Sequence, residues 1–312
     1  MLSWLRRLLP WLVPGLLVPA VAGAACPPAP GPTDPAALAA AARTDRGLLW
    51  RVERDGRASY LYGTVHVGKP EWSRLGPAVS AALAATDVLA LEIDPADPGT
   101  AGQLAAGDAP PPVLPAALRE RLARLVDASC VPPGTLKDMP ATLQVLTLSV
   151  LEARWLGLDP AYAQEFLLAA RARDAGHRVV ALETVALQRR VLLPSDPKEA
   201  LALVEGSVEQ LESGHGRLQL ALLARAWEQG DLPTLERYET WCDCARNPEE
   251  RAALKAMLDD RNPGLADGID RLHREGRRVF AAVGALHMAG PRGLPRLLAA
   301  RGFTVERLAP LP

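Results

Sequence analysis

Two of the five histidines in this chain of 312 residues occur in the same short motif. His66 ends the sequence Gly63-Thr64-Val65-His66, His287 ends Gly284-Ala285-Leu286-His287, and each motif follows an apolar run typical of a buried strand. The glycine that starts each motif lets backbone approach closely where a side chain would block a ligand. Because imidazole serves as a general base or a metal ligand near neutral pH, the two histidines are the leading candidates for a functional pair.

Two carboxylates follow other apolar runs in the same way. Glu92 comes directly after Val88-Leu89-Ala90-Leu91, and Glu183 ends a second apolar run. A charge at the end of a buried strand needs a metal ion, an arginine or a proton as its partner. Arg261 is a candidate to present its guanidinium to such a carboxylate or to a substrate. In an open α/β sheet, reactive groups gather at the C-terminal ends of the strands. We therefore expect four candidate residues to lie together at that edge of the sheet: His66, Glu92, Glu183 and His287.

Two neutral imidazoles and one carboxylate make a three-ligand set that leaves a fourth position open for water. We therefore expect His66, Glu92 and His287 to bind a divalent metal ion, Mn, Co or Zn, which lowers the pKa of the bound water for hydrolysis. The same three residues can act without a metal if one histidine removes a proton from water, and the sequence does not separate these two readings. The H-E-x-x-H, G-x-S-x-G, phosphate-loop and dinucleotide-binding motifs are absent from the sequence.

The elements that must position these residues form two units with the same order of strand, G-x-x-H motif, helix and strand. Residues 47–65 form a hairpin around Asp55-Gly56, and a helix over 77–85 then leads to a strand over 88–94. Residues 278–283 form the strand of the second unit, with a helix over 294–300 and a strand over 303–308. These βαβ units predict an α/β fold with a mixed, partly parallel sheet built from two pseudo-repeated halves.

A large helical insertion separates the two halves at about residues 110–276, with one strand near 179–183. Apolar periodicity predicts its helices at 116–128, 142–156, 161–175, 198–212, 217–229, 233–240, 248–259 and 264–275. His273 lies in the charged sequence LHREGRR near the end of the last of these helices, and we expect its side chain to be solvated. The sheet and the insertion together make one domain over residues 47–312.

The N-terminal segment has the features of an export signal. Arg6 and Arg7 precede an uncharged apolar run and the small residues that end at Ala25, which predicts a signal peptide over residues 1–25. Prolines at 10, 14 and 19 interrupt the run and argue against a membrane-spanning helix. Residues 26–46 form a Pro/Ala-rich linker, and its first residue, Cys26, is a candidate for a lipid anchor. We expect an exported protein of the periplasm or cell surface.

The four cysteines are expected to be structural, because an oxidising compartment permits disulfides. Cys242 and Cys244 stand too close in sequence for an easy mutual bridge. A bond from Cys130 to one of them is therefore the predicted pairing.

Composition excludes several classes of protein. The 35 Lys and Arg residues nearly balance 36 Asp and Glu, and the net charge of -1 argues against a nucleic-acid partner. Apolar residues make up 49% of the chain, which is close to the average for globular domains and too low for a polytopic membrane protein.

Five segments resemble successive blocks of the TraB/GumN family, which is related to the Tiki metalloproteases and to the erythromycin-esterase and ChaN-like group. They are YLYGTVHVGKPEW, VLALEID, VVALETVALQ, RNPGLADGI and the C-terminal stretch that begins VFAAVGALHM, and the match is collinear from about Leu48 to Leu308. The resemblance implies an α/β core of duplicated halves. It also implies a metal-dependent peptidase site at His66, Glu92 and His287, with Glu183 and Arg261 at positions that recur in the family.

We therefore expect an exported, metal-dependent, peptidase-like hydrolase that acts on a peptide or a small molecule. Two alternatives come from the same wider group, because a shared fold does not fix the reaction. One is a non-catalytic protein that sequesters a peptide or haem in the same cleft. The other is a metal-free, esterase-like hydrolase.

Overall fold

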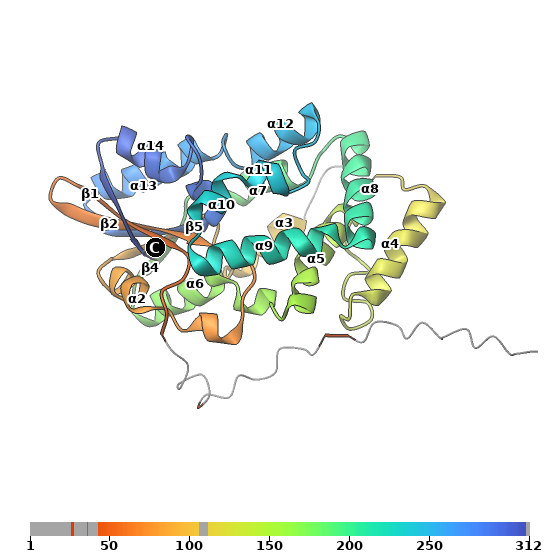
Figure 1. Ribbon diagram of the computed structural model, residues 1–312, viewed down its shortest axis with the longest axis horizontal. Helices are drawn as coiled ribbons and strands as arrows, with labels where there is room; N and C mark the ends of the chain where they lie inside the picture. Colours follow the sequence, from red (N-terminus) through yellow and green to blue (C-terminus); the bar gives the residue numbers. More distant parts are fainter. Residues whose placement is uncertain (1–25, 28–35, 37–42, 106–111, 310–312) are drawn as a thin grey trace, which may run out of the picture.

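A computed structural model describes residues 26–27, 36, 43–105 and 112–309. In this part of the chain, six strands form one sheet in the order β4-β3-β5-β2-β1-β6 (Figure 1). The strands are β1 (Leu48–Arg54), β2 (Arg57–Thr64), β3 (Val88–Leu91), β4 (Arg178–Ala181), β5 (Val279–Gly284) and β6 (Thr304–Ala309). β4, β3, β5 and β2 run parallel, whereas β1 runs antiparallel to both of its neighbours, β2 and β6. The predicted mixed, partly parallel α/β sheet is confirmed.

The hairpin of β1 and β2 turns at Asp55 and Gly56, as predicted. Arg54 pairs with Arg57 across the turn, and both turn residues have positive φ, 54° for Asp55 and 71° for Gly56. Two consecutive residues of positive φ make a type I′ turn, whose twist matches that of the flanking strands.

The two βαβ units interleave in the sheet. α2 (Pro77–Ala84) connects β2 to β3, α14 (Leu294–Ala300) connects β5 to β6, and β5 inserts between β3 and β2. β3 and the first five residues of β5 are buried, which explains their uninterrupted apolar sequences. Because β4, β3, β5 and β2 are parallel, their C-terminal ends lie along one edge of the sheet.

Helices cover both faces of the sheet and extend beyond its C-terminal edge. Figure 1 shows α13 and α14 on one face, α2 and α6 on the other, and the remaining long helices beside the sheet. The helices between β3 and β5 are α3 (Pro98–Ala105), α4 (Ala116–Ala128), α5 (Ala141–Leu151), α6 (Gln164–Asp174), α7 (Val185–Leu192), α8 (Pro197–Ser213), α9 (His215–Gln229), α10 (Leu232–Glu236), α11 (Tyr238–Trp241), α12 (Pro248–Met257) and α13 (Asn262–Arg274). Short 3₁₀ helices are η1 (Pro70–Ser73), η2 (Glu152–Leu156), η3 (Pro160–Tyr162) and η4 (Ala285–Met288).

Two apolar clusters stabilise the fold. The larger one joins the sheet to the helices on its faces, and the smaller one joins α4, α5 and α8 through residues such as Leu122, Val145 and Val204. α9 connects the two regions, and its last turn is fixed to the sheet because Trp227 Nε1 donates a 2.7 Å hydrogen bond to the Gly63 carbonyl. No helix within the described residues is long and apolar enough to cross a membrane.

The predicted solvation of His273 is wrong. Its side chain is fully buried, with Nδ1 3.3 Å from Ser59 Oγ and Nε2 3.1 Å from the Arg54 carbonyl oxygen. The charged residues around it in sequence point elsewhere, because a helix presents only part of each turn to the core.

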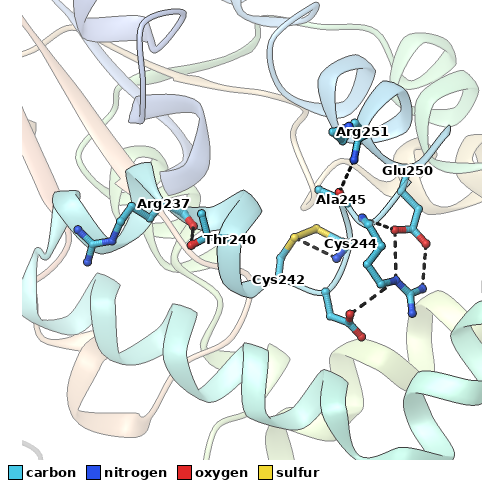
Figure 2. Close-up of a disulfide and its surroundings, with 9 residues drawn as sticks. Arg237, Thr240, Cys242, Cys244, Ala245, Glu250 and Arg251 are labelled. Carbon is cyan, nitrogen blue, oxygen red and sulfur yellow. Dashed lines mark hydrogen bonds and ion pairs between the residues drawn. A yellow bond between two sulfur atoms is a disulfide. The ribbon is translucent and has the colours of Figure 1, made fainter. Parts of the chain in front are cut away.

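The predicted cysteine pairing is also wrong. Cys26 pairs with Cys130, and Cys242 pairs with Cys244 (Figure 2). The short bridge forms because Asp243 has a φ of 51°, and this left-handed turn brings the two cysteine Cα atoms to 5.0 Å. The predicted signal peptide over 1–25 and most of the predicted linker over 26–46 lie outside the described residues.

Candidate functional site

The four residues predicted at strand ends gather at the C-terminal edge of the sheet. His66 follows β2, Glu92 follows β3, Glu183 follows β4, and His287 lies in η4 directly after β5. These strands are neighbours in the sheet, so residues up to 221 positions apart in sequence reach one site. His66, Glu92 and His287 line a cavity of about 570 Å³ together with Arg261. Glu183 lies behind Arg261 and is buried.

Arg261 joins the two carboxylates. Its Nε and Nη2 donate hydrogen bonds of 3.0 and 2.6 Å to the two oxygens of Glu183, and Nη2 also donates to Glu92 Oε2. Gln188 Nε2 donates to both carboxylates, at 3.1 Å to Glu92 and 3.3 Å to Glu183. Of the three partners expected for a buried strand-end carboxylate, the structure therefore provides the arginine. The guanidinium binds protein carboxylates, and the remaining nitrogen, Nη1, donates to the Met257 carbonyl.

The second oxygen of Glu92 is held by the backbone of the second G-x-x-H motif. Gly284 N–H donates a 2.8 Å hydrogen bond to Glu92 Oε1, and a Cβ at position 284 would lie 3.2 Å from that oxygen. Burial by itself raises the pKa of Glu92, but the interactions with His287, Arg261 and His66 and the hydrogen bond from the Gly284 N–H outweigh it and lower this pKa to about 2. Glu92 is therefore ionised at neutral pH.

Asn262 fixes the tautomer of His287. Asn262 Nδ2 donates a 2.8 Å hydrogen bond to the Arg292 carbonyl, and its Oδ1 lies 2.6 Å from His287 Nδ1. A carbonyl oxygen can only accept, so this amide orientation requires the proton of His287 to be on Nδ1. The lone pair of neutral His287 is thus on Nε2, which lies 4.0 Å from Glu92 Oε1. Burial lowers the pKa of His287 and favours this neutral form.

His66 has the opposite electrostatic environment. Its Nδ1 lies 3.0 Å from Glu165 Oε1, and Thr64 Oγ1 donates a 2.5 Å hydrogen bond to the same oxygen. The negative charge of Glu165 raises the pKa of His66 to about 9. The His66 side chain is 68% exposed, against 4% for His287, so the cation is open to the cavity.

Sequence reasoning missed Glu165 and Asn262 as partners of the histidines. Asn262 stands next to Arg261 in Arg261-Asn262-Pro263, and this position was the one signal that pointed to it. Glu165 lies in the first turn of α6, 99 residues after His66 in sequence, and no motif marks it.

The residues predicted to bind a divalent metal interact with other protein groups in this arrangement. Glu92 binds Arg261, Gln188 and Gly284 through its two oxygens. In the described parts of the chain, no group of three or more His, Cys, Asp or Glu side chains is placed to hold a metal ion. The ligand set of His66, Glu92 and His287 therefore stays a prediction.

Comparison with known proteins identifies the family. The model of the TraB/PrgY/gumN family matches residues 48–307. Two similar proteins are both named uncharacterized protein YbaP: the chain is 26% identical over 254 residues to the one from Shigella flexneri and 25% identical over 254 residues to the one from Escherichia coli (strain K12). Each match covers 78% of this chain and 88% of the relative. No solved structure matches the chain significantly. The family match spans both G-x-x-H motifs and the whole sheet up to β6, so the chain belongs to the TraB/PrgY/gumN family.

Proposed function

We propose that this chain is a hydrolase, peptidase-like in its choice of bond, in which the two motif histidines act as a general base and a general acid. One observation carries the proposal. Two imidazoles, each bound to an oxygen through Nδ1, line the same cavity and have pKa values shifted in opposite directions. Titratable groups whose surroundings push their pKa values apart are the usual acid and base of such a site.

His287 is the proposed base, because it is neutral and has its lone pair on Nε2. The 4.0 Å gap between this atom and Glu92 Oε1 is too long for a hydrogen bond, but one water molecule can bridge it. His287 takes a proton from this water as the water oxygen bonds to the substrate carbonyl carbon. Protonated His66 then gives a proton to the leaving nitrogen or oxygen as the bond from the carbonyl carbon to that atom breaks.

Glu92 and Arg261 support this step as a fixed ion pair. Because the pKa of Glu92 is about 2, its charge persists at neutral pH and stabilises the imidazolium that forms on His287. Arg261 holds Glu92 in place through an ion pair. The same guanidinium also forms an ion pair with Glu183.

A screen of the mature protein against a peptide library and a panel of neutral esters tests the proposal. We expect hydrolysis that falls about 10²- to 10⁴-fold in each of the variants His66→Gln and His287→Gln. The matched control is His215→Gln, at an exposed histidine at the start of α9. Saturable binding of peptide or haem without turnover would instead support a sequestering protein.

Metal-dependent hydrolysis is the second candidate, and one observation favours it. Histidines that bind metals usually donate their other ring N–H to an oxygen, as His66 and His287 do here. A bound Mn, Co or Zn ion would supply a water of lowered pKa. Activity that is lost in EDTA and restored by one of these ions, with heat of binding by calorimetry, would decide for this mode. Activity unaffected by EDTA would decide for the acid and base pair.

Export belongs to the proposal as well. Two disulfides among the described residues support it, because such bonds persist in oxidising compartments such as the periplasm. Fractionation of cells and the mass of the mature N-terminus test it, with cleavage expected next to Ala25 or Cys26. An intact Met1 in the cytoplasmic fraction would contradict it.

A further inference from the structure

One face of α9 forms an apolar wall of the site cavity. Gly216, Leu220, Leu223 and Ala224 line the cavity, and their spacing of four, three and one places them on one side of a helix. Gln219 of the same helix also lines the cavity. Leu218 lies on the same helix outside the cavity and is 70% exposed. The contrast shows that this face of α9 is built toward the cavity.

Other elements continue the apolar lining as far as the cavity mouth. Val150 of α5, Phe166 of α6 and Met257 of α12 all line the cavity and remain between 36% and 46% exposed. Ile93 and Leu286 add apolar surface next to the polar residues of the site. Large apolar side chains that converge on a cavity while open to solvent favour an apolar ligand, because binding removes their surface from water.

Positive charge in the cavity is already neutralised. Arg261 and the histidines are the basic residues among those described that line it. Arg261 is bound by Glu92 and Glu183, and Glu165 balances the charge of His66. The lining thus offers no unpaired Lys or Arg to a carboxylate or phosphate, and an anionic ligand at His66 would also meet the negative charge of Glu165.

We propose that this cavity binds an uncharged apolar chain, such as an acyl chain or a run of apolar peptide side chains, with the bond to be cleaved beside His66 and His287. Leu220 and Leu223 are the specificity-determining residues, because they present the α9 wall to that chain. The choice of substrate rests on the proposed hydrolase function, whereas the binding preference is measured without any reaction.

Displacement of the uncharged dye N-phenyl-1-naphthylamine tests the preference. We expect the dye to bind with a rise in fluorescence, 1-decanol to displace it, and decanoate at pH 8 to be at least about tenfold weaker, since the two competitors differ mainly in charge. Acetyl-leucyl-leucinamide distinguishes the two sources of apolar chain: displacement by this peptide at concentrations below those of decanol identifies a peptide site, and the reverse order an acyl site. Decanoate equal to or stronger than decanol would overturn the proposal.

Variants place the dye in this cavity. Leu220→Gln and Leu223→Gln should each weaken dye binding about tenfold, because each puts an amide into the apolar wall. Leu218→Gln makes the same change on the exposed side of α9 and should bind like the wild type. Melting curves establish that all three variants fold. Equal binding by all four proteins would refute the assignment to this wall. Dye binding without hydrolysis would refute the proposed hydrolase function and leave the apolar binding preference standing. Hydrolysis without dye binding would support the hydrolase function and refute the apolar binding preference.

Discussion

Asn262 Oδ1 accepts a hydrogen bond from His287 Nδ1 at 2.6 Å, and this contact determines which nitrogen of the proposed base faces Glu92. The contact also links the start of α13 to the end of β5, since Asn262 is the first residue of the helix. The buried amide of Asn262 thus determines the tautomer of His287, which lies 25 positions away in sequence.

Substitutions of Asn262 test whether its contact orients the His287 ring for catalysis. In Asn262→Leu, His287 loses the acceptor that fixes its tautomer, and we expect kcat to fall about 10- to 100-fold while KM changes little. Asn262→Asp retains an acceptor and adds a negative charge, which raises the pKa of His287. The acid limb of the pH–rate profile should therefore move to higher pH in this variant. An unchanged profile in Asn262→Asp would show that the contact does not act on the base.

The pH–rate profile of the wild type should be bell-shaped. Activity needs His287 neutral and His66 protonated, so it rises with pH through the lowered pKa of His287 and falls through the pKa of His66, about 9. Glu165→Gln removes the negative charge that raises the pKa of His66. The alkaline limb of the pH–rate profile of this variant should therefore move to lower pH. NMR titration of the His66 ring protons measures the same shift without turnover. A His66 pKa that is equal in both proteins would contradict the role given to Glu165.

Loss of Arg261 should destabilise the protein strongly. Arg261→Met leaves the side chains of Glu92 and Glu183 at 14% and 3% exposure without their shared cation. Removing one partner of a buried ion pair costs about 3 to 5 kcal/mol, and urea denaturation should show a loss of this size. The double variant Arg261→Met, Glu183→Gln should recover part of it, because one uncompensated charge is removed. Similar stability of the single variant and the wild type would argue against the ion-pair cluster.

The disulfide of Cys26 and the predicted lipid anchor exclude one another, because both use the same sulfur atom. A non-reducing peptide map should yield one peptide pair that joins Cys26 to Cys130. Replacing both cysteines with alanine should cost about 2 to 4 kcal/mol of stability, since the bond closes a long loop. A diacylglyceryl adduct on Cys26 would show that the sulfur carries a lipid instead.

Local signals in the sequence predicted most of the elements and the strand-end residues. The Asp55-Gly56 turn and the apolar runs before Glu92 and His287 depend on neighbours in sequence, and the structure confirms them. The partners of the two histidines depend on tertiary packing. Asn262 and Glu165 reach the site from helices whose positions no local pattern specifies.

Two expectations were wrong for different reasons. His273 was expected to be solvated because of its charged neighbours, yet its own side of α13 faces the core. The pairing of Cys242 with Cys244 depends on the left-handed conformation of Asp243 between them. An aspartate in the sequence does not by itself specify that conformation.

The place of β5 in the sheet has a consequence for the order in which the molecule is built. β5 inserts between β3 and β2, so the chain emerging from the ribosome holds the two flanking strands long before the strand that joins them. Pairing of β2 with β5 also closes a loop of more than 200 residues, which makes it a late and slow contact. A chain truncated before residue 279 therefore lacks both the central strand and one of the two histidines. The proposed site would accordingly be incomplete in every partly synthesised chain that ends before His287, without any inhibitor.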